Sequence, residues 1–310
     1  MATTMMRAIR VHEYGGPEKL VVETVERPEA TGSRVLVRMK AAGVNPVDWK
    51  LRSGMIKDWM PLTFPWAPGI DGAGIVEAVG PDVKGLAPGD SVFGIFSGSY
   101  AEMALAAEGD LSRKPRALSF EEAAAVPVGA LTAWKGVIED GAIQEGQRIA
   151  VLGAAGGVGL FAVQFAHWKK ARVTATASAA NAAFVKSLGA DEVIDYQAGP
   201  AEEKIRGVDV LFDTVGGETL ERALRMVKNG GVVLSVAGQV SEQAASALGI
   251  RAVRTGRAPT DRLRQIAELL ESGTIRAFIA KTFALADAAA AHRLSETRHG
   301  NGRIVLKIAD

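Results

Sequence analysis

The stretch Ile149-Ala-Val-Leu-Gly-Ala-Ala-Gly-Gly-Val-Gly-Leu160 decides the fold of this 310-residue chain. Its first four residues are apolar, as in a buried strand, and the seven that follow contain four glycines. This order predicts a strand at 149–152, a tight turn, and a helix at 158–169. The uncharged run 149–166 is just long enough to be a marginal membrane span. Glycines at this density interrupt a helix, so we interpret the run as strand, turn and helix.

The turn has the spacing of a dinucleotide-binding fingerprint, read as Ala154-x-Gly156-x-x-Gly159 with alanine at the first glycine position. Gly156 would let the backbone approach a pyrophosphate, and Gly159 would let the helix pack against the strand. The helix N-terminus would offer free N–H groups and its positive dipole end to the phosphates. A tight turn without a ligand is the alternative. The predicted cofactor-binding residues of the turn are Gly153, Ala154, Ala155, Gly156, Gly157, Val158 and Gly159.

Strands and helices alternate on the C-terminal side of this turn, which favours the dinucleotide interpretation. Apolar runs predict further strands at 172–177, 208–212 and 232–236, with helices at 181–188 and 219–227 between them. Apolar strands that alternate with helices indicate a doubly wound parallel sheet covered on both faces. The fold class is therefore α/β.

The chain has a different character before residue 127. Short alternating or apolar runs, broken by Gly, Pro and Asp, predict strands at 20–25, 34–39, 75–79 and 91–95. This part reads as mostly antiparallel β structure. The C-terminal tail predicts two helices, at 260–271 and around 286–296, and two strands, at 278–283 and 303–308.

The end of the second strand of the α/β part indicates which dinucleotide is bound. NAD-binding units place an acidic residue there to hydrogen-bond the ribose 2′-hydroxyl. Here no Asp or Glu occurs between Glu145 and Asp191, and the strand ends in Ser178. Ser178, Asn181 and Tyr196 would accept a 2′-phosphate that a carboxylate would repel. We therefore expect NADPH, with ordinary loop polarity as the alternative for these three residues.

Composition excludes several classes of protein. The 36 Lys and Arg against 35 Asp and Glu give a net charge of +1, which provides no general attraction to nucleic acid or anionic membranes. With no cysteine, the chain has no disulfide, thiolate metal site or cysteine nucleophile. No secretory signal is visible at the N-terminus, so we expect a cytoplasmic protein with no membrane or nucleic-acid partner.

Several phrases resemble the medium-chain dehydrogenase/reductase superfamily, and most closely its zinc-independent, zeta-crystallin-like quinone oxidoreductase branch. Besides the glycine turn they are Gly43-Val-Asn-Pro-Val-Asp-Trp-Lys50, Pro68-Gly-Ile-Asp-Gly-Ala-Gly74, Gly89-Asp-Ser-Val-Phe-Gly94, Gly98-Ser-Tyr-Ala-Glu102, Ala123-Ala-Ala-Val-Pro127, Ser187-Leu-Gly-Ala-Asp-Glu-Val-Ile-Asp-Tyr196, Asp213-Thr-Val-Gly-Gly217 and Gly300-Asn-Gly-Arg-Ile-Val-Leu306. They span nearly the whole chain in order. The resemblance implies a GroES-like catalytic domain at 1–127 and 258–310. It also implies a Rossmann NADP-binding domain at 128–257, a cofactor in the cleft, and a homodimer formed through edge strands.

The resemblance also allows the zinc site to be checked. Zinc-dependent alcohol dehydrogenases of the superfamily bind the catalytic metal with two cysteines and a histidine. The matching positions here hold Asn45, Ile70 and about Val128, none of which supplies a thiolate or an imidazole. We therefore expect no metal, and without a Lewis acid the oxidation of alcohols is disfavoured.

The function that follows is hydride transfer from NADPH to a quinone or to the activated C=C bond of an α,β-unsaturated carbonyl. By resemblance, Asn45 would contact the nicotinamide ribose or the substrate oxygen, and Thr132 the ribose and ring. The loop Val236-Ala237-Gly238 would hold the carboxamide, and Asp213 would belong to the cofactor site. Arg298 would swing toward the 2′-phosphate, with an exposed surface arginine as the alternative.

The proton donor and the class of protein both have alternatives. Lys50 is the ionisable candidate for proton donor. The alternative is that water donates the proton and Lys50 is a solvated surface lysine. Two other functions stay open at this point: a zinc-free alcohol or carbonyl dehydrogenase, and a structural or regulatory protein that binds NADPH without turnover.

Overall fold

The computed structural model describes residues 4–298 and 300–309, and the chain divides into two compact units. The first unit comprises Met1–Val128, Thr260–His299 and Arg303–Asp310, and the second comprises Gly129–Pro259 and Gly300–Gly302. The chain therefore passes between the units four times along its length.

The second unit is built on a sheet of six parallel strands within the described part of the chain, in the order β10-β9-β8-β11-β12-β13. The strands are β8 (Arg148–Leu152), β9 (Arg172–Ala177), β10 (Glu192–Asp195), β11 (Val208–Asp213), β12 (Val227–Ser235) and β13 (Arg251–Arg254). In sequence order this is 3-2-1-4-5-6, the arrangement of a Rossmann fold. The predicted doubly wound parallel sheet is confirmed.

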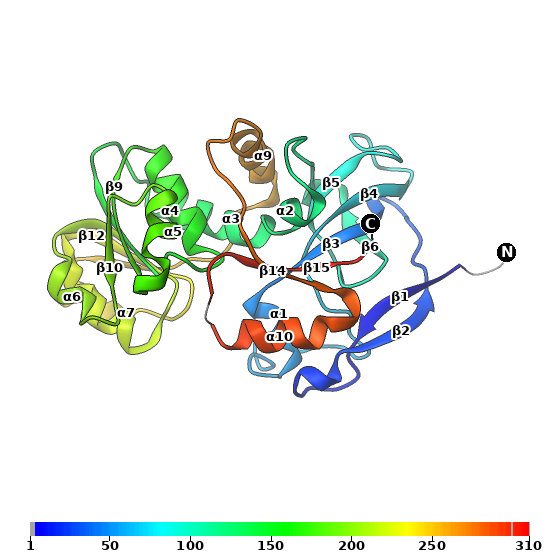
Figure 1. The fold of residues 1–310 in the computed structure, drawn as a ribbon, viewed down its shortest axis with the longest axis horizontal. Helices are drawn as coiled ribbons and strands as arrows, with labels where there is room; N and C mark the ends of the chain where they lie inside the picture. The colour runs from blue at the N-terminus through cyan, green and yellow to red at the C-terminus, as the bar shows by residue number, and fades with distance from the viewer. Residues whose placement is uncertain (1–3, 299, 310) are drawn as a thin grey trace. The chain divides into compact units, whose positions relative to one another are not determined.

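Helices cover both faces of this sheet (Figure 1). They are α4 (Gly159–Trp168), α5 (Ala182–Ser187), α6 (Ala201–Lys204), α7 (Gly217–Ala223) and α8 (Glu242–Ala247), preceded by α3 (Pro127–Trp134) and a π-helical segment, Lys135–Asp140. Residues of α6, α7 and α8 share a core with Leu152, Leu211 and Val233, which point to the same face of the sheet. Successive residues of a strand point to opposite faces, so Val151, also fully buried, belongs to the opposite face.

The first unit holds a seven-stranded sheet with the order β14-β15-β3-β4-β5-β7, in which β6 also pairs with β3, and a separate β1-β2 ribbon, as far as the chain is described. The strands are β1 (Met5–Arg10), β2 (Val21–Glu26), β3 (Arg34–Val44), β4 (Asp71–Val79), β5 (Ser91–Ile95), β6 (Met103–Ala107), β7 (Leu111–Arg113), β14 (Ile279–Ala284) and β15 (Arg303–Lys307). The antiparallel character predicted for the chain before residue 127 is confirmed for the described pairs among β1 to β7. For the tail strands no direction was predicted, and β14 and β15 run parallel.

Four helices accompany the sheet in the described residues of this unit: α1 (Pro46–Arg52), α2 (Phe120–Ala124), α9 (Leu263–Glu271) and α10 (Ala288–Glu296). Val37, Met39 and Leu306 belong to its apolar core, which α10 completes with Ala288 and Ala291. None of the described helices has the length and apolar character that a membrane span requires.

The sequence patterns missed two kinds of element. The short helices α1, α2, α3, α6 and α8 were missed because each is only four to eight residues long, which leaves little room for a periodic pattern. The edge strand β13 escaped because its sequence, Arg-Ala-Val-Arg, carries charge at both ends.

Candidate functional site

The glycine turn lies at the carboxyl end of β8, next to the carboxyl end of β11. Strand order reverses between these two neighbours, and ligands of such sheets bind in the crevice at this switch point. Gly153 has a φ of 72°, and a Cβ there would come 2.5 Å from Oγ1 of Thr214. That hydroxyl donates to the carbonyl of Leu152 at 2.8 Å. The sequence did not single out Thr214, which ties the turn to the next loop.

The two later glycines of the turn differ in what surrounds them. A Cβ on Gly159 would lie 2.3 Å from the carbonyl oxygen of Gly153 and 2.8 Å from Cα of Ala154. Only glycine therefore lets α4 begin so close to the strand. A Cβ on Gly156 would meet one atom within 4 Å, the oxygen of Gly153 at 3.3 Å. The space on the Cβ side of Gly156 is otherwise open, which fits the close approach of a pyrophosphate.

Asp213 lies at the end of β11 with no exposed surface, and its carboxylate is bonded within the protein. It accepts the N–H groups of Val215 and Gly216 and the hydroxyl of Ser235, the last at 2.6 Å. Oγ of Ser235 in turn accepts the N–H groups of Ala237 and Gly238. Asp213 therefore shapes the loops after β11 and β12, including Val236-Ala237-Gly238, so any effect it has on a cofactor is indirect.

Three predicted phosphate-binding residues meet at the carboxyl edge of β9 and β10. Ser178 follows β9, and its carbonyl accepts the N–H of Asn181 at 2.9 Å. Tyr196 follows β10, donates its backbone N–H to Ala177 at 3.3 Å, and exposes 49% of its surface. The side chains are therefore available to a ligand at this edge.

A hollow of about 450 Å³ lies at the carboxyl ends of β12 and β13. It is lined by Thr132, Val236, Arg254, Thr255, Gly256 and Arg257. Thr132 and Val236 are predicted cofactor residues and the structure brings them to one place. The two arginines were not predicted.

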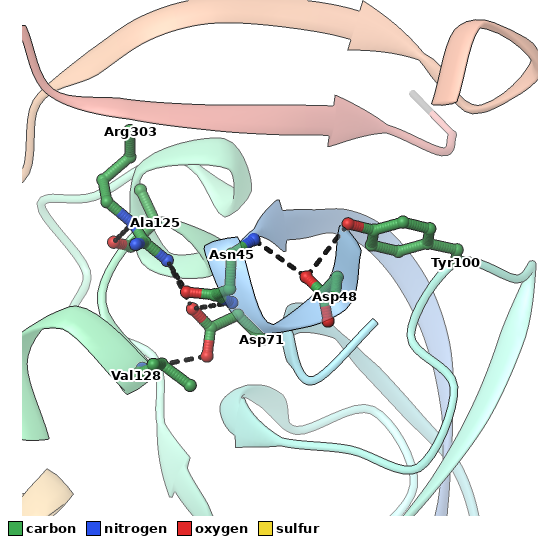
Figure 2. A network of polar contacts seen from close by, with 7 residues as sticks. All are labelled: Asn45, Asp48, Asp71, Tyr100, Ala125, Val128 and Arg303. Atoms are coloured by element: carbon green, nitrogen blue, oxygen red, sulfur yellow. Dashed lines mark hydrogen bonds and ion pairs between the residues drawn. The ribbon is translucent and has the colours of Figure 1, made fainter. Parts of the chain in front are cut away.

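Figure 2 shows a buried polar network in the first unit around Asp71 and Arg303. Asp71 is fully buried and Arg303 is 3% exposed, and their charged atoms are 2.6 Å apart. Asn45, 1% exposed, donates from Nδ2 to Asp71 at 3.0 Å and accepts at Oδ1 from Arg303 at 2.7 Å. Arg303 also donates to the carbonyl of Ala125, and Asp71 accepts the N–H of Val128. The sequence indicates Asn45 as a site residue but neither of its charged partners.

A second buried chain of hydrogen bonds begins at the backbone of Asn45. Its N–H donates to Oδ2 of Asp48 at 2.8 Å, and the Tyr100 hydroxyl donates to the same oxygen at 3.2 Å. His292 Nε2 lies 3.3 Å from that hydroxyl. Because Tyr100 gives its one proton to Asp48, the geometry assigns the His292 ring proton to Nε2.

Burial shifts the titration of both ends of this chain. Desolvation, with the nearby Asp71 charge adding to it, raises the pKa of Asp48 to about 7, although hydrogen bonds from Asn45 and Tyr100 oppose the shift. Burial, together with the charge of Arg52, lowers the pKa of His292 to about 3. Both groups are therefore neutral over much of the acidic range.

Trp49 and Lys50 belong to α1, and Arg298 lies beside them. Nζ of Lys50 lies 5.7 Å from the Trp49 ring centroid, and the Arg298 guanidinium lies 5.8 Å from it. Burial, and then the charge of Arg298, lowers the pKa of Lys50. Arg298 adopts a left-handed φ of 56°, which is uncommon for a residue with a side chain. Lys50 is half-buried, which differs from a freely solvated surface lysine.

Within the described residues, no three Asp, Glu or His side chains gather so that they could hold a metal ion. Residues at two of the positions that match the zinc ligands of alcohol dehydrogenases make hydrogen bonds within the protein. The amide of Asn45 and the backbone N–H of Val128 both bind the carboxylate of Asp71.

A Rossmann unit with an open glycine turn, joined to a β-rich unit, defines the class of two-domain nicotinamide-dependent oxidoreductases. Comparison with known proteins agrees. The alcohol dehydrogenase GroES-like domain matches residues 31–117, and the zinc-binding dehydrogenase family matches residues 188–306.

Individual relatives match nearly the whole chain. The tomato (Solanum lycopersicum) 2-methylene-furan-3-one reductase is 36% identical over 97% of this chain and 79% of its own length. Mouse (Mus musculus) quinone oxidoreductase is 34% identical over 96% of both chains. A mycobacterial protein solved in complex with NADPH superposes with a TM-score of 0.88 at 29% identity, covering 98% of this chain and all of that one. The chain belongs to the medium-chain dehydrogenase/reductase superfamily, in its zeta-crystallin-like quinone oxidoreductase branch.

The buried pair Asp48 and His292 predicts opposing effects of pH on stability. Between pH about 4 and 7 the folded protein keeps a proton on Asp48 that the unfolded chain releases, so this group makes stability fall as pH rises. His292 acts in the other direction between pH 6.5 and about 3, because only the unfolded chain protonates it. Urea unfolding of Asp48→Asn should therefore show stability that rises more steeply with pH than in the parent.

His292→Gln is the matched variant and should shift the slope the opposite way, so that stability falls from pH 4 to 7. Each change corresponds to at most one proton, or about 1.4 kcal/mol per pH unit. Identical pH profiles for the parent and both variants would contradict the titrations assigned to these groups.

The glycine turn predicts different outcomes for a glycine-to-alanine substitution at two of its positions. Gly159→Ala should lower the free energy of unfolding by about 1–3 kcal/mol, because its methyl group would overlap the backbone of the turn. Gly156→Ala should be tolerated by the fold and yet weaken binding of a nicotinamide dinucleotide about tenfold or more, because its methyl group occupies the open face. Tm and fluorescence titration with NADPH separate the two. Normal NADPH affinity in Gly156→Ala would exclude this face as the pyrophosphate site.

Proposed function

We propose that this protein is an NADPH-dependent reductase of quinones and of α,β-unsaturated carbonyl compounds. Bound NADPH would supply a hydride to the quinone or to the β-carbon of the enone. The observation that carries the proposal is the glycine turn at the switch point of the sheet, with Gly156 open to a ligand. It occurs in a chain whose relatives, matched over nearly all of its length, are named quinone oxidoreductase and 2-methylene-furan-3-one reductase.

The adenosine end of the cofactor is assigned to the carboxyl edge of β9 and β10. Ser178, Asn181 and Tyr196 offer hydroxyl and amide groups there, and no acidic residue stands at the end of β9. These groups would donate to a 2′-phosphate, which a carboxylate would repel. Arg298, which lies against Trp49 beside Lys50, is proposed to swing toward the 2′-phosphate as a further contact.

The nicotinamide end is assigned to Thr132 and to the loop Val236-Ala237-Gly238. The hollow at the end of β12 and the loop that Asp213 and Ser235 hold in place support this assignment. Asn45 is proposed to hydrogen-bond the nicotinamide ribose or the oxygen of the acceptor. One N–H of its amide is committed to Asp71, which leaves the second for such a contact.

Lys50 is proposed as the proton donor that completes the reduction. A general acid works best when its pKa lies close to the operating pH. Burial and the positive charge of Arg298 both lower the pKa of Lys50 toward that range, which supports the role. Lys50 would give its proton to the acceptor oxygen or α-carbon, and solvent would then reprotonate the amine.

Three further expectations are part of the proposal: a small-molecule acceptor as the partner, a homodimer, and a cytoplasmic location. The near-neutral charge and the absence of cysteine support the first and the last. Strands β10 and β13 lie at the two edges of the six-stranded sheet, where a second copy could pair.

The test is NADPH oxidation followed at 340 nm with 9,10-phenanthrenequinone, benzoquinones, alkenals and alkyl enones. Turnover with a quinone or an enone, and none with simple alcohols and NADP⁺, is expected. Tight NADPH binding without oxidation by any acceptor would overturn the reductase and support a protein that binds NADPH without turnover. Turnover confined to alcohols would support a dehydrogenase instead.

A comparison of NADPH with NADH in thermal unfolding tests the phosphate site. Thermal stabilisation by NADPH should exceed that by NADH at equal concentration, because bound ligand raises Tm according to its affinity. Ser178→Ala and Tyr196→Phe should reduce the difference. Equal shifts for the two cofactors in the parent protein would contradict the assignment of these side chains.

Replacing Lys50 with methionine tests the proton donor. Loss of a positioned general acid should lower kcat about 10²-fold or more while NADPH affinity stays within a few-fold. The exposed Lys186, on α5, provides the matched control Lys186→Met, which should turn over normally. Full turnover in Lys50→Met would remove this residue from the mechanism and leave water as the donor.

A further inference from the structure

The buried pair of Asp71 and Arg303 surrounds the Asn45 side chain with one acceptor and one donor. The strand register explains why these three residues meet. In the antiparallel pairs, Ile304 lies opposite Val44 and Asp71 opposite Gly43, so adjacent ends of β15, β3 and β4 carry Arg303, Asn45 and Asp71. Gly43 permits the arrangement, because a Cβ there would lie 2.9 Å from Cβ of Asp71 and 2.5 Å from the carbonyl of Ala124.

The partners of Asn45 allow only one orientation of its amide. Nδ2 donates to the Asp71 carboxylate, which has no proton to give when ionised, and Oδ1 accepts from the Arg303 guanidinium, which has no acceptor. Rotating the amide by 180° would place N–H against N–H and oxygen against carboxylate. In water an exposed asparagine exchanges freely between such orientations, whereas this one is buried and its two faces are chemically distinct.

We infer that Asp71 and Arg303 are positioning residues for the reaction, which hold the Asn45 amide in the one orientation where its second N–H can serve the cofactor or the acceptor. This inference rests on the proposed function of Asn45. The charges do not act on the reacting atoms directly. They act through Asn45, which donates a hydrogen bond only when Nδ2 stays on the side that Asp71 specifies.

The same pair also fixes the backbone that flanks the site. Nε of Arg303 donates to the carbonyl of Ala125 at 3.0 Å, and Oδ1 of Asp71 accepts the N–H of Val128 at 2.9 Å. The Arg303 guanidinium can bond Ala125, Asn45 and Asp71 together because it presents five N–H groups in a rigid plane, whereas a lysine ammonium cannot reproduce the geometry. Arg303→Lys therefore keeps the charge and removes the positioning.

The experiment is a double-variant cycle on NADPH oxidation with Asn45→Ala, Arg303→Lys and the combination of both. Each single change should lower kcat about tenfold or more. Because Arg303 acts through Asn45, adding Arg303→Lys to Asn45→Ala should change kcat by less than twofold. If the two effects multiply instead, Arg303 acts independently of Asn45 and the inference is overturned.

Two further variants separate positioning from folding. Removing one charge can leave its partner buried without compensation, so Asp71→Asn combined with Arg303→Met removes both charges together and should fold while losing kcat. Arg52 provides a matched control: it is 2% exposed and paired with Glu296 at 2.6 Å, without contact to the Asn45 amide. Arg52→Lys should lower Tm and leave kcat within twofold. An equal loss of kcat in Arg52→Lys would indicate a purely structural effect.

A second readout needs no catalytic activity. The free energies of unfolding of the parent, Asn45→Ala, Arg303→Lys and the double variant, measured in urea, should deviate from additivity, because the two side chains are in contact. Additive values would overturn the inference. A parent enzyme that oxidises no NADPH would defeat the proposed function, whereas this cycle would still decide whether the pair holds Asn45.

Discussion

A carboxylate that is fully buried must be compensated by an opposite charge and by hydrogen bonds. The first unit is organised around such a carboxylate. Asp71 lies at the first position of β4 with no exposed surface, and Arg303 from β15 supplies the opposite charge at 2.6 Å. Burying two charges is costly, so such a pair persists only where hydrogen bonds satisfy the remaining polar atoms. Here Asn45, Ala125 and Val128 provide them. Segments from four distant parts of the sequence are therefore bound to one ion pair.

The second unit also has a buried carboxylate, which is hydrogen-bonded to its loops. Asp213 is also fully buried, at the last position of β11, and it binds backbone N–H groups and the hydroxyl of Ser235. In both units a buried carboxylate at the end of a strand holds loops in a single conformation. The loops after β11 and β12 are where a Rossmann sheet binds its ligand, so the cost of burying the charge is offset by a preorganised site.

Much of this architecture is readable from the sequence, because local patterns specify it. The glycine turn, the alternation of strands and helices in the second unit and the short antiparallel strands of the first unit all follow from periodicity and turn residues. The predicted phosphate-site residues Ser178 and Tyr196 also meet as expected, since parallel neighbours bring their carboxyl ends to one edge. Strand β13 was missed because an edge strand with charged ends has no apolar run to reveal it.

The sequence by itself therefore determined the α/β class, the position of the dinucleotide turn and the family resemblance, because each depends on residues close together in the chain. Only the tertiary structure decided which side chains the Asn45 amide bonds. Its partners Asp71 and Arg303 lie 26 and 258 residues away, and no spacing rule connects them. Likewise only the tertiary structure shows that Asp213 binds Ser235 and the adjacent backbone. Burial explains the difference, since a charged side chain removed from water is bound by whichever groups the fold brings next to it.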